Sequence, residues 1–262
     1  GEATTIEAFL NVFEDANGVD LTQFGKWYLQ AGTPEVTVTD SFDASTQSYE
    51  LTLTQRTAPT PGQSDKEPMV LPVRFGLIGP NGSPMGWSRV SGGEVRDDLI
   101  VMSTPSATLR FEGIANRPVP SLFRGFSAPV KLNSSLSEAD RLFLARHDAD
   151  PFNRWQALQD VAVQLMVEAV AGEAWTEAQA DALAEALEDA VTSKELDPAF
   201  KAHTLTLPTE SIVARSIGAN VDPDRIRAVR NSLLAAIAAR IAEPLERIYL
   251  TNDSRLAYSP DF

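Results

Sequence analysis

The hydrophobic periodicity of this chain changes once, and that change divides the chain into two kinds of structure. Between residues 35 and 132, apolar residues alternate with other residues, which is the spacing of half-buried β-strands. After Asn133, apolar residues recur every three or four positions, which is the spacing of amphipathic helices. We therefore expect an α+β chain of several domains, with a β domain followed by a helical one.

The alternating region predicts an antiparallel sandwich of immunoglobulin-like size. Roughly six or seven strands fit into about a hundred residues, as in that class of sandwich. The strands are expected around Val36 to Val38, Tyr49 to Leu53, Val73 to Leu77, Leu99 to Met102, Ala107 to Glu112, and Leu122 to Leu132. Gly79 to Gly82 and Ser91 to Gly93 separate them as turns. Residues 57–68 contain three prolines and are interpreted as a surface loop rather than a domain linker.

The second region predicts stacked antiparallel helices of solenoid type. Three Asp-Pro pairs place a capping carboxylate before a first-turn proline, and two capping boxes mark further helix starts. The pairs are Asp150-Pro151, Asp197-Pro198 and Asp222-Pro223, and the boxes are Ser137 with Asp140 and Thr176 with Gln179. The apolar stripes are Phe152, Trp155, Leu158, Ala162 and Leu165; Ala180, Leu183, Ala184, Leu187 and Val191; and Ile226, Val229, Leu233, Ile237 and Ile241. Pro244 is expected to interrupt the last helix.

A short helical hairpin is expected at residues 1–32. Thr4 with Glu7 has capping-box spacing, and Asn17-Gly18 is a stop signal. The first helix would carry Ile6, Phe9, Leu10 and Phe13 on one face, and the second, capped by Asp20 with Gln23, would carry Phe24, Trp27, Tyr28 and Leu29 as far as Gly32. Two short helices cannot bury so much aromatic surface by themselves. We therefore expect a docking surface here that belongs to a larger parent domain.

Charge and composition exclude several classes of partner. A formal charge of −14, from 36 acidic and 22 basic residues, repels nucleic-acid phosphates and anionic lipid, so neither is expected as a partner. No run approaches the roughly 18 apolar residues of a membrane helix. The chain has no cysteine, which excludes disulfides, thiolate zinc sites and cysteine nucleophiles, and which suits a cytoplasmic location.

The sequence predicts no catalytic, substrate-binding or metal-binding residue within this chain. Its two histidines, His147 and His203, are far apart and belong to no His-Glu-x-x-His motif. His147 is expected near a helix C-terminus, where its charge suits the dipole, and His203 in a short helix. No Gly-x-Ser-x-Gly elbow is present. The carboxylate pairs Asp97-Asp98 and Glu185 with Glu188 are expected to be solvated.

Tryptophan side chains such as Trp27, Trp155 and Trp175 can form a platform for a sugar or a peptide. Trp27 and Trp155 lie on apolar helical stripes and are expected in a core. Trp87, in the turn region that begins at Pro84, is the one tryptophan expected to be exposed and available to a ligand.

Three stretches of the chain resemble the bacterial alanyl aminopeptidase (aminopeptidase N) family of zinc metallopeptidases. The first runs from Val19 to Phe24, through Trp27-Tyr28 and Gly32-Thr33-Pro34, to Val36-Thr37-Val38. The second contains Leu53 to Thr57, Pro59-Thr60-Pro61, Lys66, Pro68 and Leu71-Pro72-Val73. The third contains Arg117 to Leu122, Gly125 to Leu132, Arg146-His147, Asp150, Phe152 and Arg154-Trp155. The resemblance covers nearly the whole chain and is strongest between residues 17 and 160.

The resemblance implies a supporting part of a larger enzyme. In that family, zinc is held by a His-Glu-x-x-His motif with a downstream Glu, and the substrate amine is bound near Gly-x-Met-Glu-Asn; this chain contains neither motif. It is therefore expected to be an interior fragment that follows the zinc motif. A start at Gly1 rather than Met agrees with an excised piece or with a processed native terminus. Residues 1–32 would be the helical tail of the catalytic domain, 33–132 the immunoglobulin-like sandwich, and 133–262 a partial helical C-terminal domain.

The function implied for the chain is that of a non-catalytic linker and helical cap. The parent would be a zinc-dependent aminopeptidase that removes N-terminal amino acids from peptides. The chain itself would bind no cofactor, its partner would be the missing catalytic domain, and peptide substrates would reach it only through the parent.

Two other functions remain open at this point. The chain could be a stand-alone β-sandwich binding or adhesion module that recognises a ligand near Trp87. Such a module should not expose the aromatic face expected between residues 6 and 28, so an assay of apolar exposure or self-association would separate the two readings. A new hydrolase built on the two histidines is the third possibility.

Overall fold

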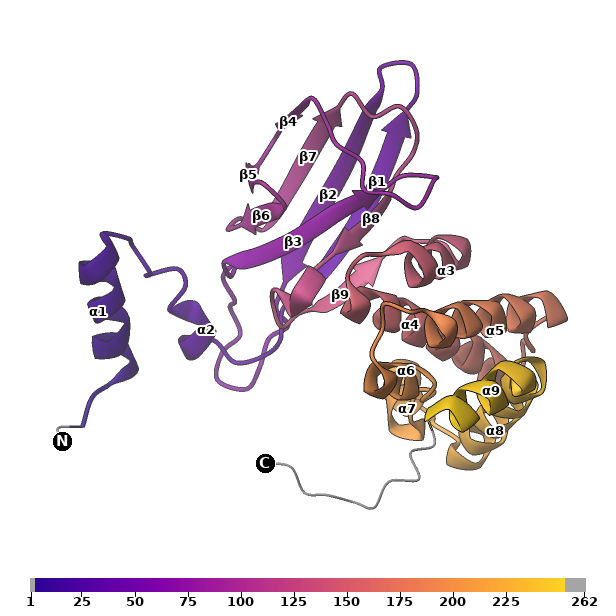
Figure 1. Cartoon of the computed structure of the whole chain (residues 1–262). Helices are drawn as coiled ribbons and strands as arrows, with labels where there is room; N and C mark the ends of the chain where they lie inside the picture. The colour runs from indigo at the N-terminus through magenta and orange to yellow at the C-terminus, as the bar shows by residue number, and fades with distance from the viewer. Residues whose placement is uncertain (1–2, 253–262) are drawn as a thin grey trace. The chain divides into compact units, whose positions relative to one another are not determined.

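The computed structural model describes residues 3–252. The chain divides into two compact units, residues 1–136 and 137–262. The first unit contains a β-sandwich preceded by two short helices, and the second is helical (Figure 1).

The sandwich consists of two sheets with the strand orders β4-β7-β2-β1-β9 and β5-β6-β3-β8. Their bounds are β1 Glu35–Asp43, β2 Ser48–Arg56, β3 Leu71–Ile78, β4 Arg89–Ser91, β5 Glu94–Arg96, β6 Leu99–Met102, β7 Ser106–Glu112, β8 Val119–Leu122 and β9 Lys131–Ser134. Alternate residues of the long strands are buried, and together they form one core that both sheets supply. The predicted sandwich is therefore confirmed.

All the strand pairs are antiparallel except one, within the part of the chain that the structure describes. β1 and β2 form a hairpin in which Val38 lies opposite Leu53, while β9 runs parallel to β1 with Leu132 opposite Val36. The parallel pair arises because the chain leaves β8 in the second sheet and crosses to the edge of the first. Sequence patterning gave no sign of this crossing.

One expected strand is wrong. Residues 122–132 were expected to form a single strand, but β8 ends at Leu122, a 3₁₀ helix η1 (Arg124–Phe126) follows, and β9 begins at Lys131. Phe123 and Phe126 have φ angles of 55° and 53°, which are left-handed and incompatible with a strand. The alternation of apolar residues predicts which side chains are buried, but it does not reveal a turn of this kind.

The N-terminal helices partly follow the prediction. α1 (Ile6–Asn17) ends at Gly18, whose φ of 63° supplies the expected left-handed cap. Its N-cap is Thr5 rather than Thr4, because the Thr5 hydroxyl accepts from the Ala8 amide at 3.2 Å.

The second helix, α2 (Lys26–Leu29), is much shorter than expected. The Asp20 carboxylate accepts from the Thr22 amide at 2.8 Å and forms a local turn. The Gln23 side-chain amide donates to the carbonyls of Pro68 and Ser103 instead of closing a capping box. The predicted box from Asp20 to Gln23 is therefore absent, and turns occupy the following residues.

The second unit contains helices α3 to α9. Their bounds are α3 Glu138–His147, α4 Pro151–Ala171, α5 Glu177–Thr192, α6 Pro198–Thr204, α7 Glu210–Ile217, α8 Pro223–Arg240 and α9 Ala242–Asn252. The three Asp-Pro pairs and both capping boxes begin helices as predicted. The break between α8 and α9 falls at Ile241, because Pro244 has no amide to donate to the Arg240 carbonyl.

The predicted apolar stripes face the core of the helical unit. Every residue of the α5 stripe is buried, as are Leu158, Ala162 and Leu165 of α4 and Ile226, Leu233 and Ile237 of α8. Phe152, Trp155 and Val229 are only half-buried. Among residues 3–252, no helix has the length and apolar character needed to cross a bilayer.

Candidate docking surface

Helix α1 is amphipathic but buries none of its residues. Phe9 is 52% exposed and Phe13 47%, and their rings pack edge to face at 4.9 Å. Val12 is 65% exposed and Ile6 48%. An amphipathic helix normally buries its apolar stripe, so α1 lacks a partner on much of its surface.

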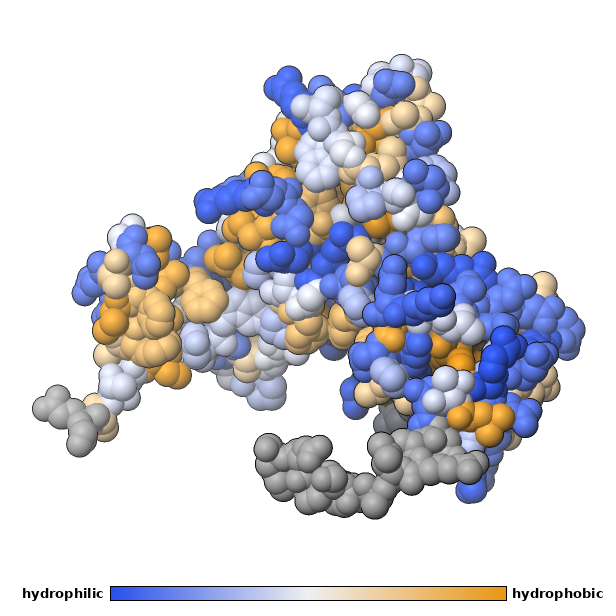
Figure 2. Space-filling model, viewed as in Figure 1, coloured by the Kyte–Doolittle hydropathy of each residue, from blue (hydrophilic) through white to orange (hydrophobic). Residues whose placement is uncertain are grey.

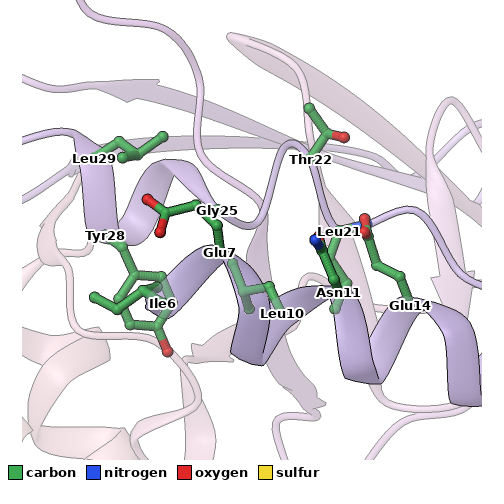
Figure 3. Close-up of a pocket in the computed structure, with 10 residues that line it drawn as sticks. All are labelled: Ile6, Glu7, Leu10, Asn11, Glu14, Leu21, Thr22, Gly25, Tyr28 and Leu29. Carbon is green, nitrogen blue, oxygen red and sulfur yellow. The ribbon is translucent and has the colours of Figure 1, made fainter. Parts of the chain in front are cut away.

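A groove of about 200 Å³ separates α1 from the segment that contains α2. Ile6 and Leu10 of α1 line it opposite Tyr28 and Leu29 of α2 (Figure 3). The Glu14 carboxylate accepts from the Leu21 amide at 2.6 Å and closes one end. Apolar residues of both helices therefore face this groove.

Helix α2 is fixed to the end of the sandwich by polar contacts. The Trp27 indole donates to the Val70 carbonyl at 3.0 Å, and its ring packs against the sandwich core, as predicted. Lys26 forms an ion pair with Glu67. The hydrogen bond from Lys26, followed by its positive charge, lowers the pKa of the Glu67 carboxyl. With Trp27 turned inward, Tyr28 and Leu29 remain 49% and 64% exposed.

These side chains form a concentrated apolar surface. We define the N-terminal apolar surface as Ile6, Phe9, Val12, Phe13, Val19, Phe24, Tyr28 and Leu29. They are eight of the fifteen large hydrophobic residues that are exposed within residues 3–252, although their segment is about a tenth of that length. Apolar surface gathers over α1 in Figure 2. A patch of this kind marks a site of protein interaction.

Comparison with known proteins agrees with the division of the chain into a β-sandwich and a helical unit. Residues 32–135 match the family described as "Domain of unknown function (DUF3458) Ig-like fold". Residues 138–262 match "Domain of unknown function (DUF3458_C) ARM repeats". The immunoglobulin-like sandwich followed by a helical solenoid, as predicted from the sequence, is confirmed.

Curated relatives decide the family. The chain is 34% identical to aminopeptidase N of Escherichia coli over 256 residues, 35% to that of Haemophilus influenzae and 41% to that of Caulobacter vibrioides, each over 253 residues. These alignments cover 95–96% of this chain. The chain is homologous to one region of aminopeptidase N. The resemblance inferred from the sequence is thereby confirmed.

The chain spans less than a third of those aminopeptidase N relatives, 28–29% of their length. A crystal structure of Legionella pneumophila aminopeptidase A in complex with aspartic acid has the same fold, with a TM-score of 0.79 at 22% identity. That match covers 98% of this chain and 28% of the Legionella chain. Most of each relative therefore lies outside the matched region.

The two histidines of the chain lie on different helices. His147 ends α3, as predicted, with its ring 4.6 Å from that of Phe143. His203 lies in α6 and stacks on Trp155 at 5.2 Å. Among residues 3–252 there is no cluster of three or more His, Asp or Glu that could hold a metal ion. The side chains described here therefore do not fit a zinc site.

One member of each carboxylate pair singled out in the sequence, Asp98 and Glu185, takes part in a surface ion pair. Asp98 pairs with Arg74 at 3.3 Å, and Glu185 pairs with Arg146 at 2.9 Å. These pairs lie on different units, and neither lines the groove between α1 and α2. They resemble ordinary surface pairs, which contribute little to stability.

Trp87 is not the exposed platform that the sequence suggested. It is half-buried and packs against the sandwich core. Its ring stacks on Phe75 at 5.4 Å and meets Phe111 edge to face at 5.2 Å. Pro84 and Gly86 are typical of an exposed turn, but the indole packs against the aromatic residues of β3 and β7.

Proposed function

We propose that this chain is a non-catalytic supporting segment of a zinc-dependent aminopeptidase that removes N-terminal amino acids from peptides. Residues 33–132 would be the linking sandwich and 133–262 part of a helical cap. Residues 1–32 would be the tail of the catalytic domain. The parent would act in the cytoplasm on peptides that bind mainly outside this chain.

The N-terminal apolar surface is the observation that carries this proposal. Phe9 and Phe13 lie on a helix that buries nothing, and the curated relatives are more than three times longer than the chain. Burying such surface contributes about 25 cal/mol per Å². The rest of the parent polypeptide is the partner that would cover it.

The metal chemistry is assigned to the rest of the parent. A bound zinc ion activates water and polarises the scissile carbonyl in hydrolytic enzymes. His147 and His203 each lie beside an aromatic ring on separate helices and do not form a ligand set. This chain's part in the reaction is to hold its neighbour in place.

A binding experiment tests the proposal. The remaining part of the parent polypeptide is produced separately and titrated with this chain, and we expect measurable association by calorimetry. The double variant Phe9→Ser/Phe13→Ser should weaken that association at least about tenfold, which corresponds to about 1.4 kcal/mol.

The matched control is Leu234→Ser, because Leu234 is 43% exposed on α8 of the helical unit. It should leave the affinity unchanged. No association of the unsubstituted chain, or equal weakening by the control, would contradict the proposal. The chain alone with added zinc should not cleave an alanyl chromogenic substrate above the buffer blank.

No observation favours the stand-alone binding module. That hypothesis depended on an exposed Trp87, and the indole packs against Phe75 and Phe111. The exposed surface lies at α1 and α2 instead.

A further inference from the structure

The segment between β2 and β3, residues 57–70, has almost no regular structure apart from an isolated bridge between Thr60 and Gln63. We call it the strap. Its backbone amides and carbonyls still need hydrogen-bond partners wherever they are shielded from water. Glutamine side chains supply several of them.

Two glutamines connect the strap and the end of α2 in both directions. The Gln30 side chain donates to the Glu67 carbonyl at 3.0 Å and accepts from the Glu67 amide at 2.7 Å. In return, the Gln63 side chain donates to the Leu29 carbonyl at 2.8 Å and accepts from the Ala31 amide at 2.8 Å. Each side-chain amide therefore bonds to backbone as a neighbouring strand would.

A third glutamine ties the strap to the sandwich. Gln55, at the end of β2, is only 7% exposed. Its side chain accepts from the Met69 amide and donates to the Met69 carbonyl, both at 2.9 Å. It also donates to the Thr104 carbonyl at 3.0 Å. The strap is thus held by side-chain amide hydrogen bonds at Gln63, Glu67 and Met69.

Lys66 completes the arrangement. Its ammonium donates to the Ala31 carbonyl at 2.9 Å, the Thr60 hydroxyl at 2.8 Å and the Gln63 side-chain oxygen at 2.6 Å. An ammonium group has three donors, and all of them are used here.

The chain passes the strap closely at Gly32. Its φ is 100°, and a Cβ at this position would lie 3.2 Å from the Thr57 methyl. Gly32 is thus suited both to the left-handed backbone and to the close approach. Two of the stretches that carry the family resemblance, one around Gly32 and one from Gln55 to Pro68, therefore meet in space.

We propose that Gln30, Gln55, Gln63 and Lys66 form a polar clamp that orients the N-terminal apolar surface for the rest of the parent polypeptide. The inference rests on the proposed function and adds the residues that position this surface. Helix α2 has four residues and cannot maintain its geometry alone. Holding an interface in its bound geometry before association raises affinity, because less ordering remains to be done. These four are positioning residues.

The first test measures the clamp in the isolated chain by amide hydrogen exchange. Gln63→Ala removes the acceptor of the Ala31 amide and should speed exchange there at least about tenfold, since a lost hydrogen bond of about 1.5 kcal/mol gives that factor. Exchange in the β1–β2 hairpin should not change. Lys66→Met, which keeps the apolar stem and loses the donors, is the second variant.

The second test measures orientation through binding to the separately produced rest of the parent. Gln63→Ala and Lys66→Met should each weaken association at least about fivefold, although neither alters a residue of the N-terminal apolar surface. The melting temperature should stay close to that of the unsubstituted chain. Gln156→Ala is the matched control, because that side chain lies in the helical unit and bonds to Asp160 at 2.7 Å.

The outcomes separate this inference from the function on which it rests. Faster exchange at Ala31 with weaker binding supports the clamp. Faster exchange with unchanged binding overturns the orienting role and leaves the proposed function intact. Unchanged exchange in both variants overturns the clamp itself. No binding by the unsubstituted chain overturns the proposed function and the orienting role together.

Discussion

Helices α1 and α5 have similar sequence signals, but the apolar face of α5 is buried and that of α1 is exposed. Both start at a threonine N-cap, with the Thr5 hydroxyl 3.2 Å from the Ala8 amide and the Thr176 hydroxyl 3.2 Å from the Gln179 amide. Both have apolar residues at the spacing of one helical face. α5 buries seven residues within the helical unit, and α1 buries none.

The difference shows what an amphipathic pattern encodes. The pattern states that one face of the helix needs an apolar partner, because water-exposed apolar area is unfavourable. It does not state whether the partner lies within the same unit. The helices that pack against α5 are α3, α4, α6, α8 and α9. The apolar face of α1 is exposed and available to a separate domain.

The largest expected effect compares core truncation in the two helices. Leu183 is fully buried in α5, so Leu183→Ala should lower the free energy of unfolding of the helical unit by about 3 kcal/mol. Phe9→Ala in α1 should change the stability of the isolated chain by less than about 0.5 kcal/mol. Urea unfolding followed by circular dichroism measures both. Equal losses would mean that α1 is part of a cooperative core.

A smaller effect compares the two N-caps. Thr176→Ala should lower the free energy of unfolding of the helical unit by about 1 kcal/mol, because the cap supports a helix that packs on its neighbours. Thr5→Ala should remove a similar local contribution, but only α1 should fray, with no change in the unfolding midpoint of the chain. Hydrogen exchange resolved by residue distinguishes local fraying from global loss. A shift of the midpoint by Thr5→Ala would contradict the comparison.

The smallest effect is a pH dependence confined to the N-terminal segment. The Glu7 backbone amide, then the Thr5 hydroxyl, lower the pKa of Glu7 from 4.5. Hydrogen bonds from the Thr22 hydroxyl, then its amide, lower the pKa of Asp20 from 3.8. Lys26 lowers that of Glu67 from 4.5. A lowered folded-state pKa means that the contribution is complete above the ordinary value and is lost as pH falls through the folded value.

Acidification below about pH 4 should therefore loosen this segment before the sandwich unfolds. The Trp27 indole N–H, which donates to the Val70 carbonyl, provides the NMR signal, and the Trp155 indole is the internal reference. Glu67→Gln should reduce the acid response of the Trp27 signal. A Trp27 signal that stays constant to pH 2.5 would show that these carboxylates do not hold the segment.

Much of the fold could be predicted because its signals are local. Asp150, Asp197 and Asp222 act as caps through hydrogen bonds within three residues, and Pro244 breaks a helix through its own missing amide. The predictions that failed depend on distant partners. Gln23 donates to Pro68 and Ser103 rather than capping a helix, and Trp87 turns toward Phe75 and Phe111.

The candidate site was predicted in part for the same reason. The aromatic residues of α1 and α2 indicated a surface in need of a partner, and Phe9 and Phe13 remain exposed. Nothing in the spacing of Gln30, Gln55 and Gln63 indicated that each would bond in two directions to backbone far along the chain. Glutamine has no strong local structural preference from which such a role could be predicted.

The sequence by itself determined the two kinds of structure, where most of the helices of the second unit begin, which faces are apolar, and to which family the chain is similar, because these depend on side-chain periodicity and on contacts a few residues long. Only the tertiary structure decided which apolar face stays open, where the chain crosses between the sheets, and how the strap holds α2. These outcomes depend on groups distant in sequence that compete for the same partners, and that competition is resolved only when the chain has folded.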